Sequence, residues 1–164
     1  MSKPQQTVTI PQALGLAMQH HTKGELPEAE SLYKMVLQRD STQVSARHML
    51  GLIAHQVGKN SAAVDLISKA LEMSPNLPDA HNNLVLALRD LGRLDEAISS
   101  YERAISERPD FSDVHYNHGA LLHERGKPSE AINSYHKALE LKPKQARTHL
   151  NLGYVLQDLG RLEE

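Results

Sequence analysis

Five glycines recur along the chain at an interval of 34 residues, and this period limits the possible folds more than any other feature of the sequence. An alanine five residues after the glycine keeps the same phase in four copies, and a proline keeps it in three. A constant interval of about 20 to 50 residues indicates a chain built from copies of one small unit. The residues that share the period are Gly24, Gly58, Gly92, Gly126, Gly160, Ala29, Ala63, Ala97, Ala131, Pro75, Pro109 and Pro143.

Apolar residues follow helical spacing on both sides of the recurrent glycine. In the third copy they stand at positions 80, 84, 87, 88 and 91, and again at 94, 97, 98, 101, 104 and 105. Residues at such intervals share one face of an α-helix. The glycine ends the first helix, and the proline ends the second because its ring clashes with the preceding turn. We therefore expect helices near 10–23, 26–39, 44–57, 60–73, 78–91, 94–107, 112–125, 128–141 and 146–159.

The period divides the 164 residues into a flexible lead, four complete copies and a truncated fifth copy. The expected boundaries are 1–9 for the lead, 10–43, 44–77, 78–111 and 112–145 for the complete copies, and 146–164 for the fifth. Because the fifth copy stops before its second helix, we expect the apolar face of its first helix to lie uncovered and to mediate self-association. That face carries Leu152, Val155, Leu156 and Leu159.

The composition excludes several classes of protein. The formal net charge is -2 and only 4% of the residues are aromatic, so the chain has neither the basic surface nor the rings typical of nucleic-acid-binding proteins. It contains no cysteine, which excludes disulfide scaffolds, thiol catalysis and cysteine-bound zinc. Residues 1–10 show no signal-peptide or membrane-spanning pattern. We therefore expect a cytoplasmic protein with neither a membrane nor a nucleic-acid partner.

With each copy numbered from 1 to 34 so that the glycine falls at position 15, further positions repeat. Positions 8, 20 and 27 are mostly small, position 24 is tyrosine in three copies, and position 32 is proline in three. This pattern resembles the tetratricopeptide repeat family. The resemblance implies an all-α, right-handed α-α superhelical solenoid whose concave face binds a protein or peptide partner. The chain departs from the family pattern at position 4, often Trp in the family and here His81, His115 and His149, and at Ser41, which replaces the first proline.

The resemblance also implies that positions 2, 5, 6, 9, 12 and 13 line the concave face. Position 6 is asparagine in three consecutive copies, as Asn83, Asn117 and Asn151. Side-chain amides both donate and accept hydrogen bonds, so such a ladder suits the backbone of an extended peptide. The alternative, which stays open, is that these amides join helices of the scaffold. The other candidate peptide-binding residues are Asn82 and Tyr116 at position 5, and His55, Arg89 and His123 at position 12.

Two functions are consistent with these features. The first is a protein-protein interaction scaffold that binds an extended peptide or partner segment through the asparagine ladder. The second rests on residues 81–84 and 91–98, which look like bacterial arrays that precede O-GlcNAc-transferase-like glycosyltransferase or sulfotransferase domains. In that case the chain would be the substrate-docking N-terminal arm of a larger glycosyltransferase.

We expect this stretch to be neither an enzyme nor a metalloprotein. It contains no phosphate-binding glycine loop, nucleophile elbow or metalloprotease motif. The histidines at position 4 recur once per copy, and helices in contact lie about 8–10 Å apart. Such a row presents single imidazoles rather than a cage of metal ligands. The sequence therefore predicts no catalytic residue, no metal site and no cofactor.

Overall fold

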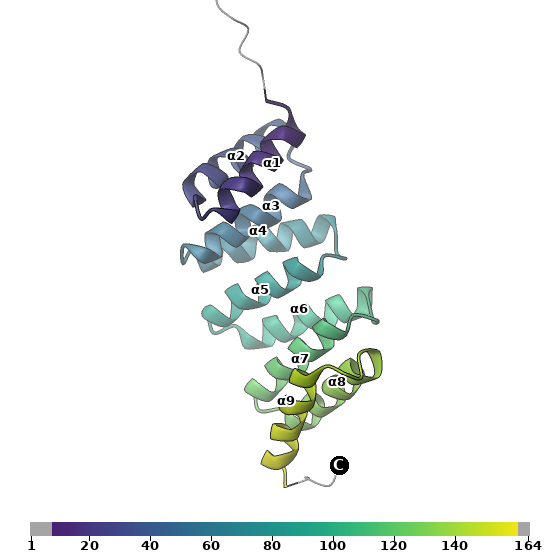
Figure 1. Cartoon of the computed structure of the whole chain (residues 1–164). Coiled ribbons are helices and arrows are strands. Elements are labelled where there is room, and N and C mark those ends of the chain that lie inside the picture. Colours follow the sequence, from purple (N-terminus) through teal and green to yellow (C-terminus); the bar gives the residue numbers. More distant parts are fainter. Residues whose placement is uncertain (1–7, 161–164) are drawn as a thin grey trace, which may run out of the picture. The chain divides into compact units, whose positions relative to one another are not determined.

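The computed structural model describes residues 8–160, and this part of the chain consists of α-helices joined by short turns (Figure 1). The chain divides between Ser74 and Pro75 into two compact units. The N-terminal unit contains α1 (Ile10–Thr22), α2 (Leu26–Arg39), α3 (Val44–Gln56) and α4 (Asn60–Met73). The C-terminal unit contains α5 (Pro78–Asp90), α6 (Leu94–Glu107), α7 (Ser112–Glu124), α8 (Pro128–Leu141) and α9 (Ala146–Asp158). The all-α fold expected from the sequence is confirmed.

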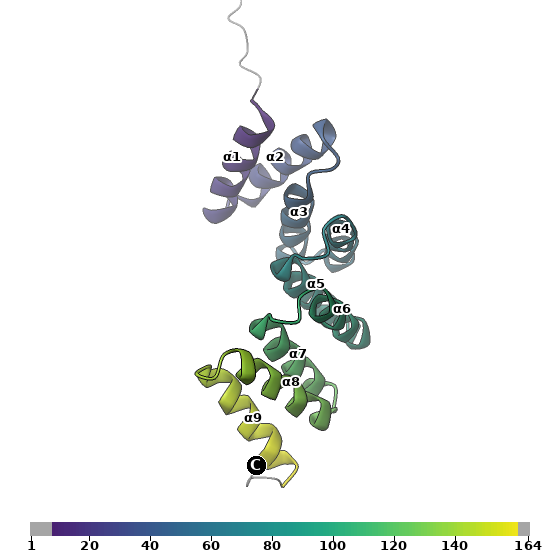
Figure 2. The same ribbon diagram turned by 90° about the vertical axis from the view of Figure 1, so that its right-hand side faces the viewer.

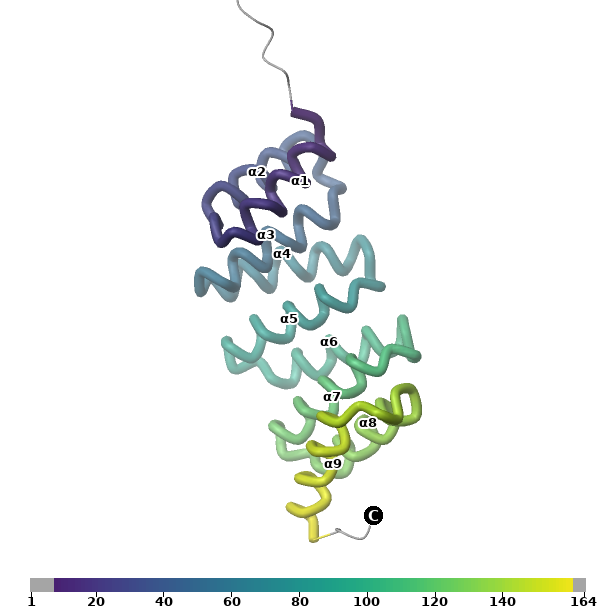
Figure 3. The backbone as a smooth tube through the Cα atoms, viewed as in Figure 1, coloured from purple at the N-terminus to yellow at the C-terminus, as the bar shows by residue number. Residues whose placement is uncertain are grey.

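Each complete copy of the repeat forms one helical hairpin. The helices pack as the pairs α1 with α2, α3 with α4, α5 with α6, and α7 with α8. Figure 2 shows the hairpin of α1 and α2, and Figure 3 traces the reversal of the backbone between α3 and α4. Within the units, neighbouring hairpins pack through α2 on α3, α6 on α7, and α8 on α9. None of the helices described between residues 8 and 160 is both long and apolar enough to cross a membrane.

The recurrent glycines end the first helix of each pair in the same way. All five have a positive φ, between 67° at Gly160 and 79° at Gly24. The residue after Gly58, Lys59, donates its backbone N–H to the carbonyl of Ala54 at 2.8 Å, and Arg93 does the same to Leu88 at 2.9 Å. This six-residue closure around a left-handed glycine satisfies carbonyls at the end of the helix. Because the residue before the glycine is the helix cap, each first helix ends one residue earlier than the sequence pattern indicated.

Small residues at position 8 bring the two helices of a pair close together. A Cβ atom added at Gly119 would lie 2.9 Å from Cε1 of Tyr135, and one added at Gly51 would lie 2.5 Å from Cγ1 of Ile67. Tyr135 and Ile67 occupy position 24 of their copies and are fully buried. In these two copies the position-24 side chain therefore packs directly on the backbone of the first helix, in space that only glycine leaves open.

The unusual residues at position 4 share one structural role. Nε2 of His81 donates to the carbonyl oxygen of Pro75 at 2.9 Å, and His115 and His149 do the same to Pro109 and Pro143, at 2.8 and 2.7 Å. In the N-terminal unit, Arg47 donates to the carbonyl oxygen of Ser41 at 2.7 Å. Position 4 thus binds the carbonyl at position 32 of the preceding copy. This contact accounts for the histidine row without a metal.

The expectation of an uncovered apolar face on the fifth copy is wrong for three of its four residues. Leu152, Val155 and Leu156 are buried, and only Leu159 is exposed. The reason is that α9 packs against α8 and also touches α7, so the preceding hairpin covers this face. Leu152, Val155 and Leu156 therefore offer no exposed surface to a second copy, and self-association stays a prediction. Of the expected flexible lead, residues 1–7 lie outside the described residues, and Thr9 is the N-cap of α1.

The close approach at position 8 predicts opposite effects of the same substitution in two copies. Gly119→Ala should lower the free energy of unfolding by about 1–3 kcal/mol, because the new methyl group overlaps the ring of Tyr135. Gly153→Ala at the equivalent position of α9 meets no atom within 4 Å. It should raise stability by about 0.5–1 kcal/mol through helix propensity. Urea denaturation followed by circular dichroism measures both values, and equal effects of the two substitutions would contradict the packing described.

Burial of two histidines predicts a pH-dependent stability. Removal from water lowers the pKa of His81, and likewise that of His118. The unfolded chain, with histidine pKa values near 6.5, therefore binds protons that the folded chain does not. Stability should be fully present above about pH 6.5 and should fall as the pH drops through the lowered values.

Urea unfolding at pH 7.5 and pH 5.5 measures this effect in a range where carboxyl groups contribute little. His81→Gln, which keeps a donor for the carbonyl of Pro75, should show a smaller difference between the two pH values. An identical stability of the wild-type protein at both pH values would contradict the prediction.

Candidate functional site

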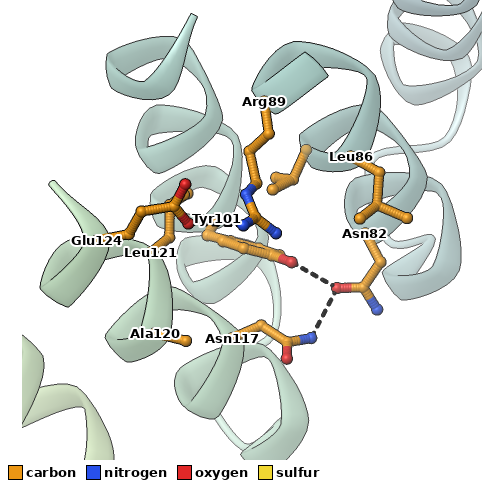
Figure 4. A pocket seen from close by; sticks show the side chains of 9 residues that line it. Asn82, Leu86, Arg89, Tyr101, Asn117, Ala120, Leu121 and Glu124 are labelled. Carbon is orange, nitrogen blue, oxygen red and sulfur yellow. Dashed lines mark hydrogen bonds and ion pairs between the residues drawn. The ribbon is translucent and has the colours of Figure 1, made fainter. Parts of the chain in front are cut away.

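A pocket lies between α5 and α7 in the C-terminal unit, with a side chain of α6 at its base (Figure 4). Its volume is about 260 Å³. Apolar side chains lie in it between two asparagines at one end and an Arg–Glu pair at the other. The lining residues are Asn82, Val85, Leu86, Arg89, Tyr101, Asn117, Ala120, Leu121 and Glu124.

One end of the pocket is closed by a bridge of two asparagines. Nδ2 of Asn117 donates to Oδ1 of Asn82 at 3.0 Å, and the hydroxyl of Tyr101 donates to the same oxygen at 2.9 Å (Figure 4). Burial raises the pKa of Tyr101, so its hydroxyl stays protonated as a donor. These two bonds fix the orientation of the Asn82 amide, since only its oxygen can accept both of them.

The other end of the pocket is closed by an ion pair between the same two helices. Nη2 of Arg89 lies 2.7 Å from Oε2 of Glu124. Both side chains are more than one third exposed, so water screens the pair and it contributes little to stability. It nevertheless fixes where the guanidinium and the carboxylate stand at the rim of the pocket.

Both contacts belong to series that repeat from copy to copy. In the first series the asparagine at position 6 donates a hydrogen bond to the residue at position 5 of the preceding copy. Asn117 bonds to Asn82 in this way, and Nδ2 of Asn151 donates to the hydroxyl of Tyr116 at 3.2 Å. Position 12 pairs with position 13 of the following copy. His123 donates to Asp158 at 3.0 Å, and in the N-terminal unit His21 donates to Gln56 at 2.9 Å. The polar rows of the repeat therefore hold successive first helices in register.

A further cluster joins α7 to α9 beside this series. The carboxylate of Asp113 accepts hydrogen bonds from Lys142 at 2.9 Å and from Gln145 at 2.8 Å, and it is also paired with Arg147. The Lys142 ammonium group is the main reason that the pKa of Asp113 lies below its usual value. The guanidinium of Arg147 stacks over the Tyr116 ring, 4.2 Å from its centroid. These contacts order the start of α9, directly after the linker.

Some of the candidate peptide-binding residues line the α5–α7 pocket, and others lie elsewhere. Asn82, Asn117 and Arg89 line the α5–α7 pocket. Tyr116, Asn151 and His123 form the next set of contacts, between α7 and α9. Asn83 is half-buried in α5 and does not line the pocket, while His55 belongs to α3 of the N-terminal unit. Peptide binding by these residues stays a prediction. The amides of Asn117 and Asn151 do make the helix-to-helix contacts of the alternative interpretation.

The apolar residues of the pocket are not among the candidate residues that the sequence indicated. Leu86 stands at position 9 and is 43% exposed, which is unusual for leucine on a well-packed helix. Position 9 of other copies is also apolar and exposed, as Met18 and Tyr154. A row of apolar residues at one inner position would have indicated this feature. Val85, Tyr101, Ala120 and Leu121 complete the apolar surface of the pocket.

The site offers binding groups and no arrangement typical of catalysis. Pockets that enclose drug-sized molecules measure roughly 300–1,000 Å³, and this one, at about 260 Å³, is smaller. Across residues 8–160, no three His, Asp or Glu side chains come together in a way that could hold a metal ion. The geometry is that of a half-apolar recess with an amide at one end and an ion pair at the other.

Comparison with known proteins places the chain in a family. The family model described as TPR repeat matches residues 86–126 and 119–160, and two models described as tetratricopeptide repeat match residues 66–99 and 44–77. No curated protein sequence matches the chain significantly.

Solved structures with the same fold include three that are similar over most of both chains. A MamA crystal structure has a TM-score of 0.81 and 23% identity, and covers 94% of this chain and 84% of that one. MamA from Desulfovibrio magneticus RS-1 has a TM-score of 0.80 and 17% identity, covering 96% and 90%. YrrB, described as a TPR protein with an unusual peptide-binding site, has a TM-score of 0.74 and 21% identity, covering 93% and 79%. The 34-residue period, the helical hairpins and the family matches agree, and the chain belongs to the tetratricopeptide repeat family.

Proposed function

We propose that this protein is an interaction module that binds an extended segment of a partner polypeptide across α5, α7 and α9. The observation that carries the proposal is the α5–α7 pocket, an apolar recess with exposed Leu86 at its wall and hydrogen-bonding groups at both ends. Binding sites commonly combine an apolar surface with a few fixed polar groups. The proposal assigns the module no catalytic role.

The size of the pocket suits a side chain of the partner better than a whole small molecule. A volume of about 260 Å³ accommodates one or two apolar side chains. Val85, Leu86 and Leu121 supply apolar contact for such a side chain, and each methylene group removed from water contributes about 0.8 kcal/mol. The bound segment is therefore expected to place a leucine, isoleucine, valine or methionine in this recess.

The asparagine bridge supplies groups for the backbone of the same segment. With Oδ1 of Asn82 occupied by Tyr101 and Asn117, Nδ2 of Asn82 and Oδ1 of Asn117 point to the side of the bridge away from Tyr101 (Figure 4). One is a donor and the other an acceptor, which is what a single peptide unit requires. The ladder predicted from the sequence would then both join the helices and present amide groups to a partner backbone.

A second candidate function uses the same row of residues. The module would be the substrate-docking arm of a larger O-GlcNAc-transferase-like glycosyltransferase, holding protein substrates along Asn83, Asn117 and Asn151. A nucleotide-sugar-binding α/β domain encoded downstream of Glu164 would support this candidate. A cytoplasmic location, with no membrane or nucleic-acid partner, belongs to both proposals.

Site-specific photo-crosslinking tests the proposed function. Benzoylphenylalanine in place of Leu86 should form a covalent adduct with a partner polypeptide in a lysate of the source cells, and mass spectrometry should identify the linked segment. The same probe in place of the exposed His136 on α8 is the control. Adducts at residue 136 but none at residue 86 would contradict the proposal.

Substitution of Leu86 should then weaken binding of the identified segment. Leu86→Ala removes apolar contact, and we expect the dissociation constant of a synthetic peptide of that segment to rise roughly tenfold, about 1.4 kcal/mol. Met73→Ala is the matched control, because Met73 lies in α4 of the N-terminal unit and its exposure, 43%, equals that of Leu86. Isothermal titration calorimetry measures both, and an unchanged affinity of the Leu86 variant would contradict the assignment of the pocket.

The asparagine bridge should contribute less to the binding free energy than Leu86 does. Asn117→Ala removes the acceptor offered to the peptide backbone and the bond to Asn82. At about 0.5–1.5 kcal/mol for one hydrogen bond, the affinity should fall about twofold to tenfold while the helical content stays constant. Asn133→Ala on the exposed face of α8 is the control. Equal affinities of the Asn117 and Asn133 variants would contradict a hydrogen bond between Asn117 and the backbone of the peptide.

A further inference from the structure

A second apolar groove lies in the N-terminal unit, between α2 and α4 and above the end of α3. Its volume is about 230 Å³. Val57, at the end of α3, is 47% exposed in it, a large fraction for a valine beside a packed core. The lining residues are Glu30, Lys34, Leu50, Ile53, Ala54, Val57, Lys59, Ala62 and Leu66. None of them belongs to the α5–α7 pocket.

At the equivalent positions of the C-terminal unit, between α6 and α8, the side chains make polar contacts. Where the N-terminal unit has Val57, the C-terminal unit has Arg125, which makes two hydrogen bonds to Asp95 at 2.8 and 3.1 Å. In place of Leu50 and Leu66, the C-terminal unit has His118 and Ser134, which are hydrogen-bonded to each other at 3.2 Å.

The two units show whether folding itself needs apolar residues at these positions. The same hairpin forms with polar residues at these positions in the C-terminal unit. Leu50 is part of the buried core and Leu66 packs on it, whereas the exposed apolar side chain of Val57 is not required for folding. Contiguous apolar surface of this kind is typical of a site that a partner covers.

The rim of the groove carries an excess of positive charge. Nζ of Lys34 lies 2.5 Å from Oε1 of Glu30, and this contact, together with the nearby charge of Lys59, keeps the pKa of Glu30 below its usual value. One carboxylate thus faces two ammonium groups. Within residues 8–160, Lys34 forms an ion pair with Glu30, whereas Lys59 acts on Glu30 only as a nearby charge. An occupant that brings a carboxylate beside its apolar side chains would complete this rim.

We propose that the α2–α4 groove is a second docking site, which binds an acidic amphipathic segment of a partner protein. One or two apolar side chains of the segment lie on Val57 and Leu66, above the buried Leu50, and a neighbouring Asp or Glu pairs with Lys59. The lysine-bearing rim disfavours basic segments, because like charges brought together across an interface repel. The site is independent of the α5–α7 pocket, so the module can hold two partner segments at once.

Selection from a phage-displayed library of random 12-residue peptides tests this proposal. The wild-type protein is the bait, and Ala62→Glu is used for counter-selection. The equivalent position of the C-terminal unit is Glu130, so the repeat tolerates a glutamate there. Enriched peptides should carry apolar residues flanked by Asp or Glu. Enrichment of neutral or basic peptides, or no enrichment, would overturn the proposal.

Fluorescence anisotropy with the most enriched peptide then measures the contribution of single residues. Ala62→Glu should weaken binding at least tenfold, and Lys59→Gln should weaken it about threefold and reduce its dependence on salt. Leu86→Ala should leave the affinity unchanged, which separates this site from the one under Proposed function. A loss of binding in Leu86→Ala alone would refute the second site. Sedimentation that shows a dimer abolished by Ala62→Glu would instead assign the groove to a second copy of the chain.

Discussion

In the hairpins α3–α4 and α7–α8, the packing of one side chain on one stretch of backbone sets how closely the two helices approach. At position 24, Tyr135 or Ile67 lies against the first helix where position 8 is glycine, at a separation that leaves no space for a methyl group. Attraction between closely packed atoms is small per contact and large in sum. The close approach fixes how the two helices of a pair sit together. The positive-φ glycine at position 15 provides the turn that the approach requires.

Polar contacts then set each hairpin relative to the next within a unit. The histidines of position 4 bind a carbonyl of the preceding linker, and the rows at positions 5 and 6 and at positions 12 and 13 join successive first helices. Such contacts specify register more than they add stability, since several of them are exposed. The same contacts determine which polar groups stay available to bind a ligand. The α5–α7 pocket exists because the Asn82–Asn117 bridge and the Arg89–Glu124 pair hold its two ends while leaving apolar surface between them.

Much of the fold can be predicted from the sequence, because the period places equivalent residues in equivalent environments. The helix starts at Pro78, Leu94 and Ser112 agree with the expected positions, since glycine and proline mark them locally. The burial of Leu152 and Leu156 was not foreseen, because it depends on how closely α9 packs on α8. The sequence pattern allowed the position-6 amides to join helices, but it did not identify Asn82 as the partner of Asn117 or indicate the exposure of Leu86, because both depend on distances between helices. The pattern indicated the row of candidate residues, whereas the pocket within that row depends on the spacing between α5 and α7.

Methyl NMR spectroscopy can detect whether the α5–α7 pocket receives an apolar side chain of a partner polypeptide. The protein would be labelled at Leu and Val methyl groups and titrated with a peptide of the segment cross-linked at residue 86. The largest shift changes should occur at Val85, Leu86 and Leu121, which line the pocket. Val36 and Val114, which are buried elsewhere, should change little. Shift changes confined to other residues, with the pocket methyl groups unaffected at saturation, would contradict binding in this pocket.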